Sequence, residues 1–110
     1  MSSECVQMIE ETGVIAILRA SSANKLIQAC SALMEGGIRA VEVTLTTPGA
    51  LQTIEQARRN FPAQFFFGAG SVTTLDQAQQ AITAGAQFLV SPTINPEVIA
   101  YCVQMDIPAC

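Results

Sequence analysis

Residues 40–49 read AVEVTLTTPG, and the fold of the chain is organised around them. The first six alternate apolar with polar residues and are rich in β-branched types, which predicts a short strand, and Pro48-Gly49 is typical of a helix start. Helical patterns flank this strand, so it should be buried on both faces. An unpaired buried carboxylate such as Glu42 costs on the order of several kcal/mol. We therefore expect Glu42 to be paired, protonated or in contact with a cavity at the strand end, where α/β proteins carry out chemistry.

Composition and charge limit the class of protein. The chain has 110 residues, enough for one domain at most, and 50% are apolar while 13% are charged. A small chain with so much apolar surface is expected to bury part of it against something outside these residues. A net charge of −4 favours neither nucleic acid nor an anionic membrane as a partner. No apolar run approaches the roughly 20 residues of a membrane span, and the acidic N-terminal stretch does not resemble a signal peptide, so we expect a cytoplasmic protein.

The cysteines are typical of reduced, structural thiols. They number four, at irregular positions, with no CxxC pair and no histidine anywhere in the chain, which argues against a zinc site. We expect reduced thiols. Cys30 and Cys102 lie among apolar residues at helical spacing and are expected to be buried as small apolar side chains.

The rest of the sequence predicts parallel (β/α) repeats. A short amphipathic helix ends near Gly13, and the strands that follow start about 22 to 26 residues apart, the spacing of a βα repeat. Strands are expected at residues 14–18, 40–45, 65–67 and 88–90, with a fifth beginning at 107–110. The 14–18 strand is continuous in apolar residues and is expected to be fully buried. The intervening helices are expected to follow Ser21-Ser22, Pro48-Gly49, Thr74 and Asn95-Pro96.

This order predicts an α/β fold that curls toward a barrel. Right-handed crossovers place each helix on the same side of the sheet. A (β/α)8 barrel has about 250 residues. Residues 1–110 are therefore interpreted as an incomplete single domain, roughly the first half of a TIM (β/α)8 barrel preceded by a short N-terminal helix.

The barrel interpretation gathers polar residues onto one rim, because strand ends and the loops after them line barrel active sites. The rim residues are Arg19, Glu42, Thr44, Thr46, Ser71, Ser91 and Pro92. Glu42 is the strongest candidate, since a carboxylate in mid-strand needs a reason. Arg19 is either functional or a solvated charge, whereas Ser91 and Thr47 suit ordinary capping roles. The Gly68-Ala69-Gly70-Ser71 sequence is explained by a tight turn as well as by a phosphate loop, and it lacks the P-loop lysine.

Four segments carry a family resemblance, namely residues 13–19, 36–45, 68–72 and 84–92. In this order and spacing they resemble the bacterial 2-keto-3-deoxy-6-phosphogluconate (KDPG) and 4-hydroxy-2-oxoglutarate (KHG) aldolases, over residues 13–110. The resemblance implies a class I aldolase, a (β/α)8 barrel assembled as a homotrimer. It implies cleavage of a phosphorylated keto-acid substrate to pyruvate and an aldehyde, through a lysine Schiff base and a proton-shuttling glutamate. It also implies that no metal or organic cofactor is used.

The resemblance assigns roles to five residues. Glu42 matches the proton-shuttling glutamate. Ser71 stands where the family usually has a threonine near the pyruvate moiety, and Pro92 matches a wall of the same pocket. Arg19 lies in the first strand-end loop, where the family often has a basic residue. Thr46 replaces an arginine that often binds the substrate carboxylate.

The resemblance also implies that the Schiff-base lysine and the phosphate-binding loops lie beyond Cys110. Lys25, the only lysine of the chain, falls in the helix after the first strand and cannot replace it. We therefore expect aldolase activity of a full-length protein and an inactive chain here. Two alternatives remain open: another phosphate-binding TIM-barrel enzyme, such as an epimerase or decarboxylase relative, and a half-barrel assembly or binding module without activity.

Overall fold

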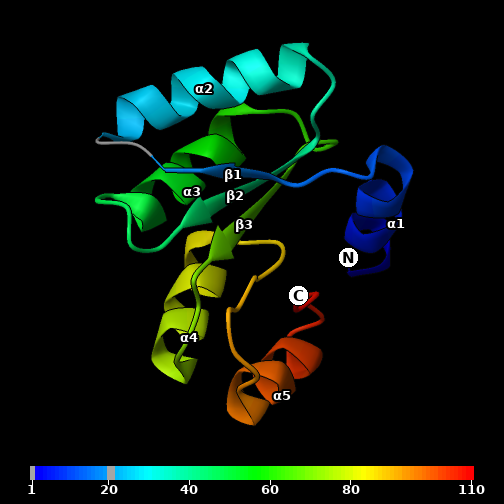
Figure 1. Ribbon diagram of the computed structural model, residues 1–110, viewed down its shortest axis with the longest axis vertical. Helices are drawn as coiled ribbons and strands as arrows, with labels where there is room; N and C mark the ends of the chain where they lie inside the picture. The colour runs from blue at the N-terminus through cyan, green and yellow to red at the C-terminus, as the bar shows by residue number, and fades with distance from the viewer. Residues whose placement is uncertain (1, 20–21) are drawn as a thin grey trace.

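The computed structural model describes residues 2–19 and 22–110 and has parallel strands at its centre (Figure 1). Its sheet contains β1 (Ala16–Leu18), β2 (Ala40–Thr44) and β3 (Phe66–Gly70), in the order β1-β2-β3. Both strand pairs are parallel, as predicted, and the register sets Glu42 opposite Ile17 on one side and Gly68 on the other.

Two further segments extend the sheet beyond β3. Single parallel bridges join Ala69 to Leu89 and Leu89 to Ala109. The predicted strands at residues 88–90 and 107–110 are therefore present as bridges and not as full ladders. The α/β fold of parallel repeats is confirmed, and the curl of the sheet is that of part of a TIM barrel.

Helices connect and cover the strands. In the described residues they are α1 (Ser2–Thr12), α2 (Ala23–Glu35), α3 (Ala50–Asn60), α4 (Leu75–Ala84) and α5 (Pro96–Gln104). Their starts agree with the sequence signals: Ser22 caps α2, Thr74 and Gln77 form a capping box on α4, and Asn95 caps α5. Ser21, the other residue expected to cap α2, lies outside the described residues.

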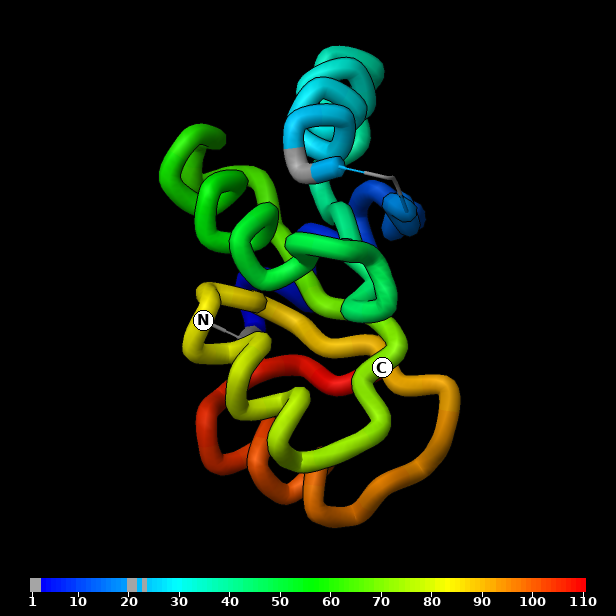
Figure 2. Tube along the Cα trace, turned by 90° about the vertical axis from the view of Figure 1, so that its left-hand side faces the viewer, coloured from blue at the N-terminus to red at the C-terminus, as the bar shows by residue number. Residues whose placement is uncertain are grey.

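Alternation along β2 separates two faces of the sheet. Val41 and Val43 are fully buried in the clusters beneath the helices, so Glu42 and Thr44 stand on the opposite, inner face. Helices α2 to α5 succeed one another along the outer face, in chain order from top to bottom of Figure 2.

Helix α1 lies at the amino-terminal ends of the strands (Figure 1). There it contributes to a cluster made of Cys5, Met8, Ala40, Phe66 and Phe88. The inner face is therefore closed by apolar packing at one end of the strands. The polar residues of β2 lie toward the other end.

The first strand differs from its prediction. β1 begins at Ala16, two residues later than expected, and it is not fully buried: Ile17 is 60% exposed and Val14 45% exposed. Within the described chain β1 is the edge strand, and the Ile17 side chain is left largely uncovered. The apolar run there was read correctly as a strand, but the expectation of full burial was wrong.

The third strand was predicted too early. β3 comprises Phe66–Gly70, so the Gly-Ala-Gly sequence lies inside a buried strand and not in a turn. A Cβ added at Gly68 would overlap the ring of Phe88. Glycine is thus required here by a close side-chain approach, which the sequence alone does not distinguish from a turn.

The expectation for two cysteines is confirmed. Cys30 is 0% exposed and Cys102 is 1% exposed, each within a cluster of apolar side chains. Burial raises the pKa of the Cys30 thiol to about 11, which keeps it protonated and unreactive. The four cysteines are all free thiols.

Candidate functional site

Glu42 is buried on the inner face of β2, with 5% of its surface exposed. Its carboxylate crosses the neighbouring strand: a Cβ added at Gly70 would overlap Oε1, Cδ and Cγ of Glu42. The side chain therefore occupies the space that a residue larger than glycine at position 70 would need. Gly70 makes this placement of the carboxylate possible.

Burial and a neighbouring charge act in opposite directions on the pKa of Glu42. Burial raises the pKa of its carboxyl above the ordinary value, and the positive charge of Arg19 partly offsets this. The pKa of the Cys110 thiol is raised by desolvation and also by the nearby charge of Glu42. Glu42, Arg19 and Cys110 thus share one electrostatic environment at the carboxyl ends of the strands. A carboxyl whose pKa is moved toward neutrality can both donate and accept a proton.

Backbone hydrogen bonds make the rim continuous. The amide of Leu45 donates to the Gly70 carbonyl at 2.9 Å, and that of Val72 donates to Val90 at 3.1 Å. The amide of Ser91 donates to the carbonyl of Cys110 at 2.9 Å. The loops after successive strands are thereby tied side by side around Glu42.

The predicted rim residues differ in their surroundings. Arg19 is exposed and acts on Glu42 through its charge. Ser71 follows Gly70 directly, is half-buried, and has a left-handed backbone with φ of 59°. Such a backbone is uncommon outside glycine, and residues of this kind cluster at functional sites. Thr46 and Pro92 are both exposed, in the turns after β2 and after the Leu89 bridge.

Two residues of the site carry no strong sequence signal. Gly70 was interpreted as part of a turn, and Cys110 as the start of a strand. Their places in the site follow only from the pairing of the strands. Gly70 stands opposite Thr44, and the bridges bring residues 109 and 110 beside the strand at Leu89. A hollow of about 150 Å³ next to this rim is lined by Ser91, Asn95, Ile99 and Cys110, among others.

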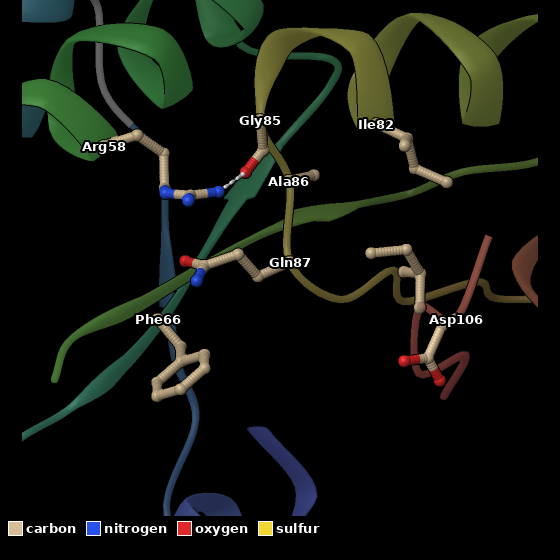
Figure 3. Close-up of a pocket in the computed structure, with 8 residues that line it drawn as sticks. Arg58, Phe66, Ile82, Gly85, Ala86, Gln87 and Asp106 are labelled. Carbon is tan, nitrogen blue, oxygen red and sulfur yellow. Dashed lines mark hydrogen bonds between the residues drawn. The ribbon is translucent and has the colours of Figure 1, made fainter. Parts of the chain in front are cut away.

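A larger hollow of about 270 Å³ lies at the opposite ends of the strands (Figure 3). Arg58 Nη1 donates to the Gly85 carbonyl at 2.6 Å across it, and Gln87 Oε1 accepts from the Phe67 amide at 3.0 Å. Both polar side chains are therefore engaged with backbone, which ties α3 to the start of the strand at Leu89. This hollow is separate from the Glu42 site.

The described residues offer no set of metal ligands. No group of three or more His, Cys, Asp or Glu side chains in that part of the chain could hold a metal ion. None of the described helices is long and apolar enough to cross a membrane.

The chain is similar in sequence and in fold to known proteins. The family model for KDPG and KHG aldolase matches residues 5–110. A 2-dehydro-3-deoxy-phosphogluconate aldolase from Treponema pallidum is 40% identical over 102 residues, covering 93% of this chain and 48% of that protein.

Solved structures share the fold. The KDPG aldolase from Legionella pneumophila, with pyruvate captured at low pH as a covalent carbinolamine intermediate, superposes with a TM-score of 0.80 at 33% identity, over 86% of this chain and 46% of that one. A cube-shaped protein cage designed by fusing symmetric oligomeric domains matches with a TM-score of 0.81 at 30% identity, over 87% of this chain and 36% of that one. The chain spans about half the length of the curated relatives it matches.

Proposed function

Because the chain belongs to the KDPG and KHG aldolase family, we propose that it is the amino-terminal half of a class I aldolase. The complete enzyme would cleave KDPG, KHG or both to pyruvate and an aldehyde. The observation that carries the proposal is the buried Glu42 carboxylate, which lies over Gly70 with a raised pKa.

Glu42 serves as the general acid and base of this chemistry. When the amine of a lysine adds to the substrate ketone, the carbinolamine must lose its hydroxyl as water. A protonated Glu42 supplies the proton to that hydroxyl, and the resulting carboxylate later takes a proton from the substrate. The raised pKa makes the protonated form of Glu42 more accessible than that of an ordinary carboxyl.

The lysine of this mechanism lies outside residues 1–110 in our proposal. Lys25 is exposed on α2, on the outer layer of the fold, and the inner face of the described chain presents Glu42 instead. The family resemblance supports a Schiff-base lysine on a later strand. The phosphate-binding loops belong to the same later part of the barrel.

The remaining rim residues position the substrate. Arg19 places a positive charge where a 2-oxo acid carboxylate would be attracted, and Ser71 offers a hydroxyl beside Gly70. Thr46 and Pro92 complete the proposed pocket. At position 46 a neutral threonine hydroxyl stands where the family often has a charged arginine. The binding partner is a small keto acid.

We further propose a cytoplasmic homo-oligomer, a trimer in the family pattern. Apolar side chains support an interface: Ile94 is 88% exposed, and Val103 and Ile99 are 76% and 44% exposed one turn apart on α5. The symmetric oligomeric domains of the designed cage support it too. Sedimentation of the full-length protein at several concentrations would test the trimer, and a monomer throughout would reject it.

Imine trapping tests the enzymatic proposal. The full-length protein, incubated with pyruvate and then reduced with borohydride, is expected to gain the mass of one reduced pyruvate per chain on a single lysine. An epimerase, a decarboxylase that works without an imine, or an inactive binding module would gain none. Absence of the adduct from folded full-length protein therefore rejects the class I assignment.

A further inference from the structure

One buried polar group near Glu42 has no function in the chemistry described above. Thr44 is 1% exposed, and its Oγ1 is buried without a hydrogen-bond partner among the described residues. Buried hydroxyls are usually bonded, because losing water without a replacement costs free energy. An orphaned hydroxyl in mid-site therefore indicates a missing partner.

The structure gives a contrast within the same chain. Thr53, on α3, is equally buried at 0% exposure, and its Oγ1 donates to the Gly49 carbonyl at 2.9 Å. Burial of a threonine in this fold is therefore compatible with a bonded hydroxyl. The hydroxyl of Thr44 differs from that of Thr53 in lacking a partner, and the position of Thr44 on the sheet accounts for this difference.

Thr44 stands on the same inner face as Glu42, one step closer to the carboxyl end of β2. The register sets it opposite Gly70, the residue over which the Glu42 carboxylate lies. Arg19 acts on the same carboxylate, and Ser71 follows Gly70. The hydroxyl and the carboxylate thus stand on one face of β2, with the hydroxyl nearer the carboxyl end of the strand.

We propose that Thr44 Oγ1 donates a hydrogen bond to the carboxylate of the bound 2-oxo acid. Glu42 must reach the ketone carbon of the substrate. The substrate carboxylate, on the adjacent carbon, is then placed nearer the carboxyl end of β2, where Thr44 stands. A carboxylate accepts strongly from a hydroxyl, and an orphaned donor is suited to it. The inference deepens the proposed aldolase function and rests on it.

The experiment uses the full-length protein and four versions: wild type, Thr44→Val, Thr44→Ser and Thr53→Val. Valine keeps the shape of threonine and removes the hydroxyl. Each version is titrated with pyruvate, and the fraction trapped by borohydride gives the pyruvate concentration for half-saturation. Melting temperature is measured with and without pyruvate.

Thr44→Val is expected to need on the order of tenfold more pyruvate for half-saturation, the usual effect of one hydrogen bond to a charged group. Its melting temperature without pyruvate holds or rises, because the orphaned hydroxyl is gone. Thr44→Ser stays within about threefold of wild type in half-saturation, since the donor is kept. Thr53→Val melts lower and keeps wild-type half-saturation, because it loses a bond remote from the site. With acetone, which has the ketone but no carboxylate, the Thr44→Val penalty disappears.

Unchanged half-saturation in Thr44→Val overturns the proposal and assigns the hydroxyl another partner. A loss of melting temperature like that of Thr53→Val, with pyruvate binding intact, assigns it a structural role and overturns the proposal too. A penalty that persists with acetone overturns the choice of the carboxylate. If wild type forms no adduct, the proposed function fails separately. The pyruvate-induced rise in melting temperature then decides: a rise in wild type that Thr44→Val lacks supports the proposal, and any other result rejects it.

Discussion

Glu42 stands between two valines that pack under the helices, and its own side chain is turned to the inner face. Glu42→Gln keeps the size of the side chain and removes the titrating proton. We expect kcat of the full-length enzyme to fall on the order of 10²–10⁴-fold, the usual contribution of a general acid or base. The pyruvate adduct formed after long incubation should change little. Steady-state kinetics and trapped mass measure the two effects.

The same substitution has a pH-dependent effect on stability. Burial raises the pKa of Glu42, so the native state binds this proton more tightly than the unfolded chain does. The stabilisation of the native state by the bound proton of Glu42 is fully present below the pKa of Glu42 in the unfolded chain, about 4.3. It is lost as the pH rises through the pKa of Glu42 in the folded chain. The melting temperature of Glu42→Gln should therefore equal that of wild type near pH 4. At neutral pH it should equal or exceed the wild-type melting temperature. A variant that melts markedly lower at neutral pH, with unchanged turnover, would identify Glu42 as a structural ion-pair partner.

Gly70 tests the same site from the neighbouring strand. Gly70→Ala puts a methyl group where the Glu42 carboxylate lies, so the carboxylate must move. We expect a cost of about 1–3 kcal/mol in stability, as for other overpacked positions, and a loss of turnover on the order of 10²-fold or more as proton transfer is misaligned.

Gly36→Ala is the matched control for that substitution. Its added Cβ would approach Leu33 O at 3.4 Å, an ordinary contact, and the φ of Gly36 is −81°. Both stability and turnover should hold. In the double variant Glu42→Gln, Gly70→Ala, the losses in turnover should not add, because both act through one carboxylate. Full additivity would show that Gly70 acts independently.

Among the elements, the helices could be predicted closely from the sequence. The expected start at Thr74 is the N-cap of α4, and Asn95-Pro96 is the N-cap and first residue of α5. Capping residues act on their own backbone, so their signal is local. The strands were less predictable because their limits depend on neighbours. The glycines of β3 are required by side chains of Phe88 and Glu42, which are distant in the sequence, and the exposure of Ile17 depends on what covers the edge of β1.

The candidate site likewise contains one residue that the sequence predicts and others that depend on the sheet. Glu42 was predictable, since a charge within an apolar strand is visible in the sequence itself. Its support by Gly70 and its closeness to Cys110 depend on register and curl, which no local pattern records. The roles of Glu42, Arg19, Thr46, Ser71 and Pro92 remain predictions.

The capping box of α4 provides a test at the level of the element. Thr74 Oγ1 accepts from the Gln77 amide at 3.2 Å, and Gln77 Oε1 accepts from the Thr74 amide at 3.3 Å. Thr74→Ala is expected to cost about 0.5–2 kcal/mol in the free energy of unfolding. Thr83→Ala, at an exposed position of the same helix, should cost nothing. Urea denaturation measures both, and equal stabilities would show that the capping box contributes nothing. Turnover per folded molecule should not change in either.

At the scale of the whole molecule, our proposal gives residues 1–110 the acid and base of the enzyme and places its Schiff-base lysine in a later part of the barrel. We expect the purified 110-residue chain to show no aldol cleavage of KDPG above a trace. Release of pyruvate, followed with a coupled dehydrogenase assay, measures it. Lys25→Met is the control, because residual turnover that this variant abolishes would make Lys25 the nucleophile after all. Turnover comparable to that of a full-length enzyme would contradict our division of the site.

The close approach of Glu42 to Gly70 also has a consequence for redesign. The two positions share a single volume, so the reach of the acid and the bulk at residue 70 can be exchanged for one another. A library that varies only residue 42 or only residue 70 would contain mostly variants in which this volume is overpacked or left as a cavity. Paired changes, with a shorter acid at 42 and a small side chain at 70, would move the proposed proton donor across the barrel while conserving packing. Substrate range could then be altered by shifting the donor and leaving its chemistry intact.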